Sequence, residues 1–448
     1  MTKEFVKTIY LPVGVPTFHL ESAQAEFEKS VRLLKSIDPG VVCPDEMLMS
    51  IDLLGQFLED KHPDLVIFQD ITFANSAYME EVLRRFHHAR VLLWTVREPV
   101  IDGGRLRLNS LTGAFSAANA MRQYGRSFEY IYGSADEEKV KNKLSAAIKA
   151  IKLMKGLEEL KIAQIGHTPQ GFGFGRALDS DMLYWFGTRV ESIEARELID
   201  KAKSFKDDEC TEYLEKARKA IKGLDETPEK NLFDFAKLYK AYDEYVKQNG
   251  IGALASRCWP DFFTSYGTPV CAVLGMLNDE GIASACEADA YGALSMYIGV
   301  QLSGSPVFFG DPVSLDEKEN NVYFWHCGTA ACSLARQDTG AVCGVHCNRK
   351  IGPTLEFGCR ASEKVTIFRI GRESDGNFRS LIAVGEALDM PQQFLGTSLV
   401  VKTEGNAEEF VYTAVEKGWE PHYVVIYGDH AEELEILSHM LSIDVERY

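Results

Sequence analysis

The stretch "DLVIFQDITFANSAYMEEVLRRFHHARVLLWTV" (64–96) decides the fold of the N-terminal third of the chain. A short apolar run is followed by a segment with helical periodicity and then by a second apolar run. This spacing predicts two parallel strands joined by a crossover helix. The same alternation begins at "TIYLPVGV" and continues through "FEYIYG" into the long segment "EEKVKNKLSAAIKAIKLMKGL". We therefore expect a doubly wound α/β domain over residues 1–158.

Two further domains are expected after residue 158. A second strand-helix alternation begins at "LKIAQIGHTPQGFGF" and predicts another doubly wound α/β domain over 159–305. Residues 204–250 are rich in charge and predict two solvated helices that are broken at "DETPE". The segments after about residue 320 are short and strand-like, which indicates a β-rich, barrel-like domain over 306–448.

Composition and charge restrict the partners. The 448 residues include 48 basic and 66 acidic side chains, a formal net charge of −18. Such a surface repels phosphate backbones and anionic lipid headgroups, so we expect neither nucleic acid nor a membrane as partner. The N-terminus has no pattern of an export signal, and glycines and Pro306 interrupt the uncharged run 290–310. The expected location is the cytoplasm and the expected partner is a small molecule.

The ten cysteines allow two interpretations. Their irregular spacing beside apolar residues is typical of buried, reduced thiols in a cytoplasmic protein. The alternative is a soft-metal site around "CGVHC", formed by Cys343, His346 and Cys347 with Cys327 and Cys332 nearby.

A glycine-rich stretch, "GFGFGR" (171–176), follows a predicted strand. Its spacing departs from the G-x-G-x-x-G pattern of dinucleotide sites, which favours a mobile binding loop over a nucleotide site.

Acidic residues stand at both ends of an apolar run, "ACEADAYGALSMYIGVQLSGSPVFFGDP" (285–312). We expect Glu287 in a helix beginning near Ala283, where it could favour the helix dipole, while Asp311 could begin a turn. Together the two acids can converge at one end of a sheet, with Asp289 in a supporting position. Two carboxylates and one imidazole are ligands that Mg²⁺ or Mn²⁺ accepts. The candidate imidazole is His422, which lies where a loop enters a strand in "GWEPHYVVIYGD", whereas His326 reads as a core or supporting residue.

Three segments resemble the L-fucose isomerase family. The run 286–312 is similar to the family segment that carries a Glu and an Asp at the spacing of Glu287 and Asp311. The segment "HYVVIYGDHAEELEILSHMLSIDV" (422–445) resembles the family's C-terminal segment, and "SRCWPDF" (256–262) matches its R-x-W-x-D pattern. The length of the chain resembles the compact branch of the fucose/arabinose isomerase superfamily.

The resemblance implies a metal-dependent aldose–ketose isomerase. The metal would be Mn²⁺, with Mg²⁺ or Co²⁺ as alternatives, held by Glu287, Asp311 and His422. Glu287 and Asp311 would also transfer the proton through a cis-enediol. The expected second α/β domain carries Glu287, and the β-rich domain carries Asp311 and His422. The residues expected to bind substrate are Arg257, Trp259, Trp94, Arg97 and Arg105.

The resemblance also implies a homo-oligomer, a trimer or hexamer, in which Trp94, Arg97 and Arg105 complete a neighbouring subunit's pocket. The default substrates are L-fucose and D-arabinose. A hexose with an anion at C6, such as sulfoquinovose, is a second option, because the loop 95–110 carries arginines that suit an anion. Pro421 stands where the family has Asn, and Ser256 where it has Gln, which leaves the sugar open. The alternatives are a non-catalytic sugar-binding or regulatory protein and, third, a nucleotide-dependent dehydrogenase.

Overall fold

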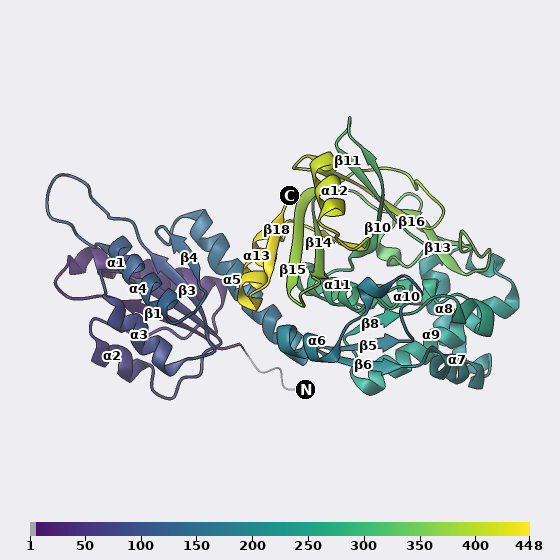
Figure 1. Ribbon diagram of the computed structural model, residues 1–448, viewed down its shortest axis with the longest axis horizontal. Helices are drawn as coiled ribbons and strands as arrows, with labels where there is room; N and C mark the ends of the chain where they lie inside the picture. Colours follow the sequence, from purple (N-terminus) through teal and green to yellow (C-terminus); the bar gives the residue numbers. More distant parts are fainter. Residues whose placement is uncertain (1–5) are drawn as a thin grey trace. The chain divides into compact units, whose positions relative to one another are not determined.

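The computed structural model describes residues 6–448 and divides the chain into two compact units (Figure 1). Among the described residues, the first unit comprises 6–155 and Glu432–Ser442. The second comprises Gly156–Ala431 and Ile443–Tyr448. The C-terminal helix α13 (Ala431–Leu441) thus groups with the first unit rather than with the strands that precede it. The domain spans 1–158, 159–305 and 306–448 stay predictions.

A parallel sheet forms the centre of the first unit. Its strands pair in chain order: β1 (Thr8–Val13), β2 (Leu65–Asp70), β3 (Arg90–Thr95) and β4 (Glu129–Tyr132). Its helices are α1 (Leu20–Ile37), α2 (Ile51–Phe57), α3 (Ser76–Arg85), α4 (Ser110–Gln123) and α5 (Glu138–Glu159). The strand-helix-strand predicted for 64–96 is confirmed as β2, α3 and β3.

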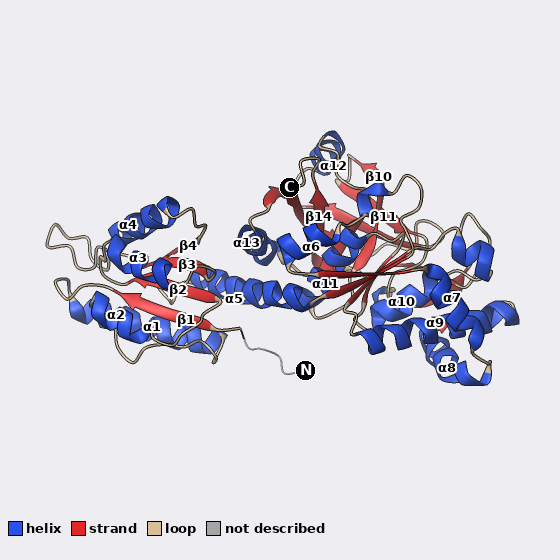
Figure 2. Cartoon of the chain, turned by 60° about the horizontal axis from the view of Figure 1, so that its bottom comes forward, coloured by secondary structure: helices blue, strands red, loops and turns tan. Residues whose placement is uncertain are grey.

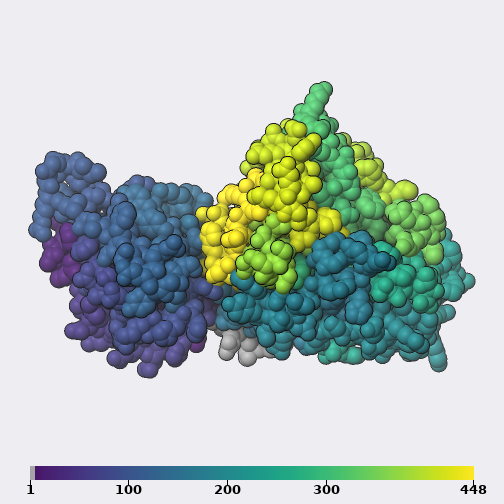
Figure 3. All heavy atoms as spheres, in the orientation of Figure 1, coloured from purple at the N-terminus to yellow at the C-terminus, as the bar shows by residue number. Residues whose placement is uncertain are grey.

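The sequence explains why α3 forms between these strands. The Asn75 side chain accepts a hydrogen bond from the Ala77 N–H and so caps the first turn. Tyr78, Met79, Val82 and Leu83 recur at helical spacing and are buried on the sheet. The loop after β3 instead reaches into solvent, with Ile101 93% exposed, and it projects from the first unit in Figure 3.

The second unit contains a smaller parallel sheet whose strand order reverses. The order is β6-β5-β8-β9, and all of its pairs are parallel. The strands are β5 (Lys161–Ile165), β6 (Arg189–Ile193), β8 (Ala253–Ser256) and β9 (Ala283–Ala285). The chain leaves β5 toward β6 on one side and returns to β8 on the other. In parallel α/β sheets, ligands bind at the carboxyl ends of the strands beside such a reversal.

Helices surround this sheet. They are α6 (Asp179–Phe186), α7 (Ala195–Ser204), α8 (Thr211–Ala220), α9 (Glu229–Asn249), α10 (Cys271–Asp279) and α11 (Ala290–Ser303). The two helices predicted within 204–250 are confirmed as α8 and α9. The helix expected to begin near Ala283 is a wrong prediction, because 283–285 form strand β9 and α11 begins only at Ala290.

The remaining strands form a ten-stranded sheet that closes on itself (Figure 2). Neighbours pair in the order β15-β14-β17-β10-β11-β16, and β15 also pairs with β16, which makes a closed barrel. These strands are β10 (Phe308–Asp316), β11 (Asn321–His326), β14 (Ser362–Arg372), β15 (Phe378–Ala387), β16 (Thr397–Thr403) and β17 (Tyr423–Tyr427). The tip of the β10–β11 hairpin projects from the surface (Figure 3). The predicted fold class, α/β followed by a barrel-like β-rich region, is confirmed.

Three short strands extend the barrel sheet beyond β16, and one lies beyond β15. They are β7 (Ile221–Lys222), β12 (Ala341–Gly344), β13 (Thr354–Gly358) and β18 (Asp444–Arg447). Helix α12 (Ala407–Glu416) follows β16. Helix α11 contacts β8 and β9 of the parallel sheet and also β14 and β17 of the barrel. Among residues 6–448, no helix combines the length and the apolar character needed to cross a membrane.

Candidate active site

The site lies where the strand order of the smaller sheet reverses. The loop after β5 carries Phe172 and Phe174, the loop after β8 carries Arg257 and Trp259, and the turn after β9 carries Glu287. The barrel adds Asp311 from β10 and His422 from the residue before β17. Because β10 and β17 are antiparallel neighbours that pair Gly310 with Tyr423, these last two side chains are adjacent.

The predicted acids converge on one imidazole. His422 Nε2 lies 2.9 Å from Glu287 Oε2 and 3.5 Å from Asp311 Oδ1. The His422 side chain is 1% exposed, whereas Glu287 and Asp311 keep 16% and 29% of their side-chain surface accessible. The carboxylates therefore form the accessible part of the cluster and the imidazole its buried floor.

The backbone at Glu287 has an unusual conformation. Glu287 and Ala288 have φ of 59° and 54°, in the left-handed region. Such residues cost about 1–3 kcal/mol each and are concentrated at functional sites. The turn ends at Asp289, whose side chain accepts the Gly292 N–H at 2.8 Å and caps α11. From this turn, ahead of α11, the Glu287 carboxylate reaches His422 Nε2 at 2.9 Å.

Asp289 supports His422 from behind. Its Oδ2 is 2.9 Å from His422 Nδ1, and Arg369 donates to both of its oxygens at 2.7 and 3.1 Å. Asp289 and Arg369 are both fully buried. Burial alone would raise the pKa of Asp289, but the charge of Arg369 and the His422 hydrogen bond outweigh it and lower that pKa. The supporting position predicted for Asp289 is confirmed by this contact.

The carboxylates change the ionisation of the imidazole. Burial alone would lower the pKa of His422, but hydrogen bonds to Asp289 and Glu287 raise it to about 10. Burial raises the pKa of Asp311, while His422 and His326 oppose that rise. The neighbouring carboxylates therefore favour the protonated form of the His422 imidazole.

Aromatic rings line the cluster. The Phe174, Phe309 and Phe172 ring centroids lie 5.3, 4.8 and 6.4 Å from that of His422. Gly175 lets the loop of the two phenylalanines approach, because a Cβ there would lie 2.8 Å from the Asp289 Cα. The loop predicted to bind a ligand thus lies against the predicted imidazole.

The donor atoms suit a hard divalent cation. Glu287, His326 and His422 each offer one ligand atom within 4.8 Å of the others, and Asp311 adds a carboxylate beside His422 Nε2. Carboxylate oxygens with imidazole nitrogens are the mixture that Mn²⁺ or Mg²⁺ accepts. His422 Nδ1 is already held by Asp289, which is how proteins usually orient a ligating histidine.

Known proteins resemble the chain over its whole length. The family described as L-fucose isomerase, C-terminal domain, matches residues 326–448. A sulfoquinovose isomerase from Clostridium sp. (strain MSTE9) is 62% identical over 440 residues, covering 98% of both chains. Sulfoquinovose isomerases from Priestia aryabhattai and Alkalicoccus urumqiensis are 37% and 36% identical, again covering 98% of both chains.

The chain belongs to the fucose-isomerase-like family that includes the sulfoquinovose isomerases. It is an isomerase, of the aldose–ketose class that acts on a sugar. Family membership thus sets aside the non-catalytic sugar-binding protein and the dehydrogenase considered from the sequence.

The other predicted substrate residues fall in two places. Trp259 donates its indole N–H to Glu287 Oε1 at 3.2 Å, and Arg257 pairs with Asp261 at 2.8 Å. Trp259 therefore adjoins the carboxylate cluster, and Arg257 lies beside Trp259, because its Nε also donates to the Trp259 carbonyl at 3.0 Å. Arg97 and Arg105 belong to the first unit, where Arg97 pairs with Glu137 and Arg105 donates to the Thr17 carbonyl. Their role toward a substrate stays a prediction.

Trp94 requires a correction. It is fully buried within β3, and its indole N–H donates to the Gly133 carbonyl at 2.8 Å. Its alternating neighbours in a parallel strand are buried too, as is usual for a sheet covered on both faces. Trp94 is a core residue of the first unit and offers no surface to a sugar.

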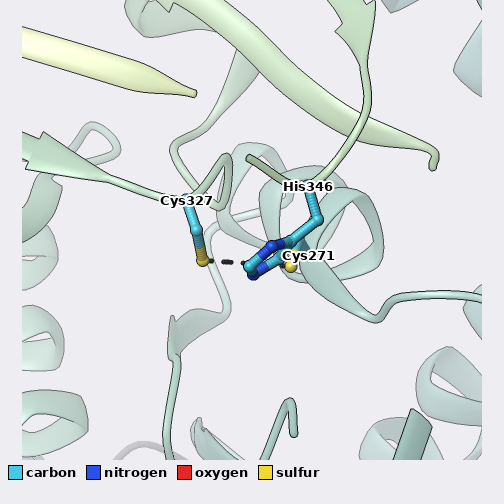
Figure 4. A group of neighbouring side chains, drawn as sticks. All are labelled: Cys271, Cys327 and His346. Carbon is cyan, nitrogen blue, oxygen red and sulfur yellow. Dashed lines mark hydrogen bonds between the residues drawn. The ribbon is translucent and has the colours of Figure 1, made fainter. Parts of the chain in front are cut away.

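The soft-metal group in the structure has a different membership from the predicted one. Cys327 and His346 do come together, but their third partner is Cys271 of α10 (Figure 4). The Cys343 thiol instead lies 3.2 Å from the Thr227 hydroxyl. The choice of Cys343 rested on sequence proximity within "CGVHC", whereas Cys271 reaches the group from a distant helix.

Sequence reasoning missed several residues of the site. Arg369 lies within a barrel strand of ordinary appearance, and His326 was given only a core or supporting role. The signal available for Arg369 was a lone basic residue in the apolar run "VTIFRIG" (365–371), since a buried arginine requires a buried acid.

Proposed function

We propose that the chain is a Mn²⁺-dependent aldose–ketose isomerase whose substrate is a hexose with an anion at C6, sulfoquinovose being the first candidate. The observation that supports this best is the convergence of Glu287 and Asp311 on His422 Nε2, at 2.9 and 3.5 Å. Mg²⁺ and Co²⁺ are the alternative cations. The names of the relatives, three sulfoquinovose isomerases, support the choice of sugar.

Glu287, Asp311 and His422 would hold the cation. The chemistry that a bound divalent cation supplies is polarisation of the C1 carbonyl and acidification of the C2 hydroxyl. Asp289 keeps His422 Nδ1 engaged, so that Nε2 faces the two acids. Arg369 holds Asp289 ionised, because its guanidinium lowers the pKa of that carboxyl.

The two acids would carry the proton. Converting an aldose to a ketose moves one hydrogen from C2 to C1 and one proton from O2 to O1. One carboxylate removes the proton from C2 to give the cis-enediol, and the proton is then delivered to C1. Burial raises the pKa of Asp311, which brings it closer to that of a group able to give and take a proton near neutrality. The rings of Phe172 and Phe174 would keep water from the enediol.

A homo-oligomer belongs to the same proposal. Side chains of the loop after β3 and of α4 are unusually exposed for apolar residues: Ile101 is 93%, Phe115 73% and Leu106 48% exposed. Grouped apolar exposure of this kind marks contact surfaces. A second copy of the chain would cover it. The cytoplasmic location stays a prediction.

The proposal is tested by following sulfoquinovose, its neutral 6-deoxy analogue, L-fucose and D-arabinose by NMR with the purified protein. We expect a ketose from the sulfonated sugar, no turnover after dialysis against a chelator, and recovery with Mn²⁺. Asp311→Asn should lose at least about a hundredfold in kcat. Asp316→Asn, in the same strand, is the matched control and should keep wild-type turnover. Full activity of the chelator-treated protein would contradict the metal requirement.

A further inference from the structure

A second group of metal-ligating side chains lies in the same unit, formed by sulfur rather than oxygen. Cys271 opens α10, Cys327 follows β11 and His346 follows β12. Their ligand atoms all lie within 4.8 Å of one another, and the two sulfurs are 4.0 Å apart. Figure 4 shows the two thiols and the imidazole directed at a common point. All three side chains are buried, at 0%, 9% and 5% exposure.

We propose that Cys271, Cys327 and His346 bind a soft divalent cation of the Zn²⁺ class. In a tetrahedral site, Zn–S bonds of about 2.3 Å place two sulfurs about 3.8 Å apart. The observed 4.0 Å between the Cys271 and Cys327 sulfurs is close to that edge. Ligand binding therefore needs only a small movement of the two side chains.

A further buried thiol lies beside this group. Cys286, buried and free, forms a second group with Cys327 and His326, again within 4.8 Å. Cys286 thus shares Cys327 with the proposed site, and Cys271, Cys327 and His346 would leave one position of a tetrahedral Zn²⁺ for a further ligand.

Charge favours a cation at this place. Two thiolates balance one divalent cation, so a Zn²⁺ complex with Cys271, Cys327 and neutral His346 has no net charge. A neutral complex avoids the cost of burying an isolated ion. The His346 ring is held by the Phe263 ring at 4.9 Å, and its Nδ1 receives only a long hydrogen bond of 3.3 Å from the Asn348 N–H. A cation at Nδ1 would replace only that hydrogen bond of His346, and at the thiols it would replace the 4.0 Å contact between Cys271 and Cys327.

The group differs in kind from the oxygen cluster beside it. Thiolates select Zn²⁺ and related soft ions, whereas carboxylates select Mn²⁺ and Mg²⁺. His326 lies between them, with Nδ1 3.4 Å from the Cys327 sulfur and its ring 5.7 Å from that of His422. A cation bound to Cys327 would therefore hold the end of β11 in place, and with it His326, whose ring lies beside His422.

The test is a Co²⁺ titration of the full-length protein after chelator dialysis under reducing conditions. We expect one equivalent of Co²⁺ to give a thiolate-to-cobalt charge-transfer band in the near ultraviolet, which Zn²⁺ then removes. The band should be lost in Cys271→Ser and Cys327→Ser. It should persist in Cys359→Ser, a buried cysteine outside the group, and in Asp311→Asn, which changes only the oxygen cluster.

Absence of a thiolate band in the wild-type protein at saturating Co²⁺ would overturn the assignment, whether or not the serine variants fold. A band that survives in both Cys271→Ser and Cys327→Ser would do the same. Because oxygen and imidazole ligands produce no thiolate band, the outcome is independent of whether the protein isomerises any sugar.

A different observation concerns the anion of the substrate. The Arg349 guanidinium lies 5.1 Å from the ring centroids of both Trp259 and Phe263. Among residues 6–448 no carboxylate pairs with it, in contrast to Arg257, which pairs with Asp261. Arg349 is partly buried, so it is a positioned cation with free donors.

We infer that Arg349 binds the C6 anion of the substrate, an inference that rests on the proposed function. Trp259 contacts both Arg349 and Glu287. Its indole N–H donates to Glu287, and the Arg349 guanidinium lies over its ring. The Arg349 guanidinium and the Glu287 carboxylate therefore adjoin the same indole, which puts a cation next to the proposed reaction site. A planar guanidinium suits a sulfonate because it donates two parallel hydrogen bonds.

Steady-state kinetics with sulfoquinovose and its neutral 6-deoxy analogue test this role. We expect Arg349→Met to raise KM for the sulfonated sugar about tenfold to a hundredfold, with partial recovery in Arg349→Lys. The neutral sugar should be turned over as by wild type. Arg360→Met is the matched control, because the Arg360 guanidinium also lies over an aromatic ring, 4.4 Å from the Tyr427 centroid. This variant should leave the KM values of both sugars unchanged.

A KM for sulfoquinovose within twofold of wild type in Arg349→Met would overturn the inference while leaving the proposed isomerase intact. If the wild-type protein isomerises the neutral sugar but not the sulfonated one, the choice of a C6 anion fails and Arg349 loses its assigned ligand with it.

Discussion

Asp289 determines which nitrogen of His422 faces the two acids. It accepts from Nδ1 at 2.9 Å while Arg369 holds both of its oxygens. This arrangement makes Nε2 the nitrogen available to a cation. Arg369 of β14 and Asp289 after β9 thus orient the His422 ring so that the lone pair of Nε2 faces the two acids.

Asp289→Asn should weaken Mn²⁺ binding about tenfold to a hundredfold, the usual effect of removing a partner of a ligating histidine. The amide keeps the shape of the carboxylate but loses the charge that holds His422 and Arg369. The measurement is Mn²⁺ titration followed by electron paramagnetic resonance. Glu420→Gln, also near Arg369, is the control, and equal Kd values for both variants would contradict the role of Asp289.

A second residue-scale prediction concerns His439 of α13 and Glu129 of β4, 2.7 Å apart in the first unit. The hydrogen bond to Glu129 raises the pKa of His439. Burial would raise the pKa of Glu129, but His439 and Lys143 lower it. The stabilisation by His439 is therefore complete below the unfolded-state pKa of about 6.5 and is lost as pH rises through the folded-state pKa.

His439→Gln should lower the free energy of unfolding by about 0.5 kcal/mol at pH 5.5 and by less at pH 9, since the half-exposed ring is screened by solvent. Denaturant titrations at the two pH values measure it, with the exposed His88→Gln as control. Equal losses at both pH values would show that the pair contributes by packing alone.

Three residues that the structure brings together could be named from the sequence, whereas those that support them could not. The acids bordering an apolar run and the histidine before a strand made Glu287, Asp311 and His422 candidates, and the resemblance to the L-fucose isomerase family joined them into one site. Arg369 and His422 reach Asp289 across 80 and 133 residues of chain. No local pattern encodes such a contact, so only the folded chain reveals it.

At the scale of elements, the loop after β5 brings two phenylalanines to the imidazole. Gly175 allows this approach, because a Cβ there would lie 2.8 Å from the Asp289 backbone. Gly173 in the same loop has nothing within 4 Å of the corresponding position. The two glycines of one short motif therefore have different physical roles.

Gly175→Ala should lower kcat/KM at least about tenfold, because displacing the loop opens the site to water and disturbs the reacting geometry. Gly173→Ala is the matched control and should remain close to wild type. Steady-state kinetics on both variants, with melting temperatures to verify folding, provide the measurement. Equal activities would mean that the loop tolerates displacement.

Elements with strong periodicity were predicted well, and weakly patterned ones were not. The segment 64–96 has two apolar runs and a capped amphipathic helix, and it folds as β2, α3 and β3. The alanine-rich start of 283–303 favours a helix by propensity. Its first three residues instead form β9, because parallel pairing with β8 satisfies their backbone.

On the scale of the whole molecule, the grouping of the C-terminal helix could not be read from the sequence. Residues 432–442 belong with the N-terminal unit, although the strands on both sides of them belong to the other. An amphipathic helix at the chain end shows which of its faces is apolar, but not which sheet it will cover.

The exposed apolar residues of the first unit predict self-association. Ile101→Asp combined with Phe115→Asp should shift the protein to a smaller species in light scattering coupled to size exclusion, since charges at both positions oppose burial. The exposed pair Glu408→Gln and Glu416→Gln is a suitable control. If the wild type is a multimer and the double variant has the same molar mass, the contact surface lies elsewhere.

The central claim is that two carboxylates and one imidazole carry a metal-dependent isomerisation. The most direct test is the conversion of sulfoquinovose in deuterium oxide, followed by NMR, for wild type and Glu287→Gln with and without Mn²⁺. The account predicts a ketose and deuterium at the reacting carbons only for wild type with the metal. Conversion by Glu287→Gln at the wild-type rate, or by wild type after chelation, would contradict it.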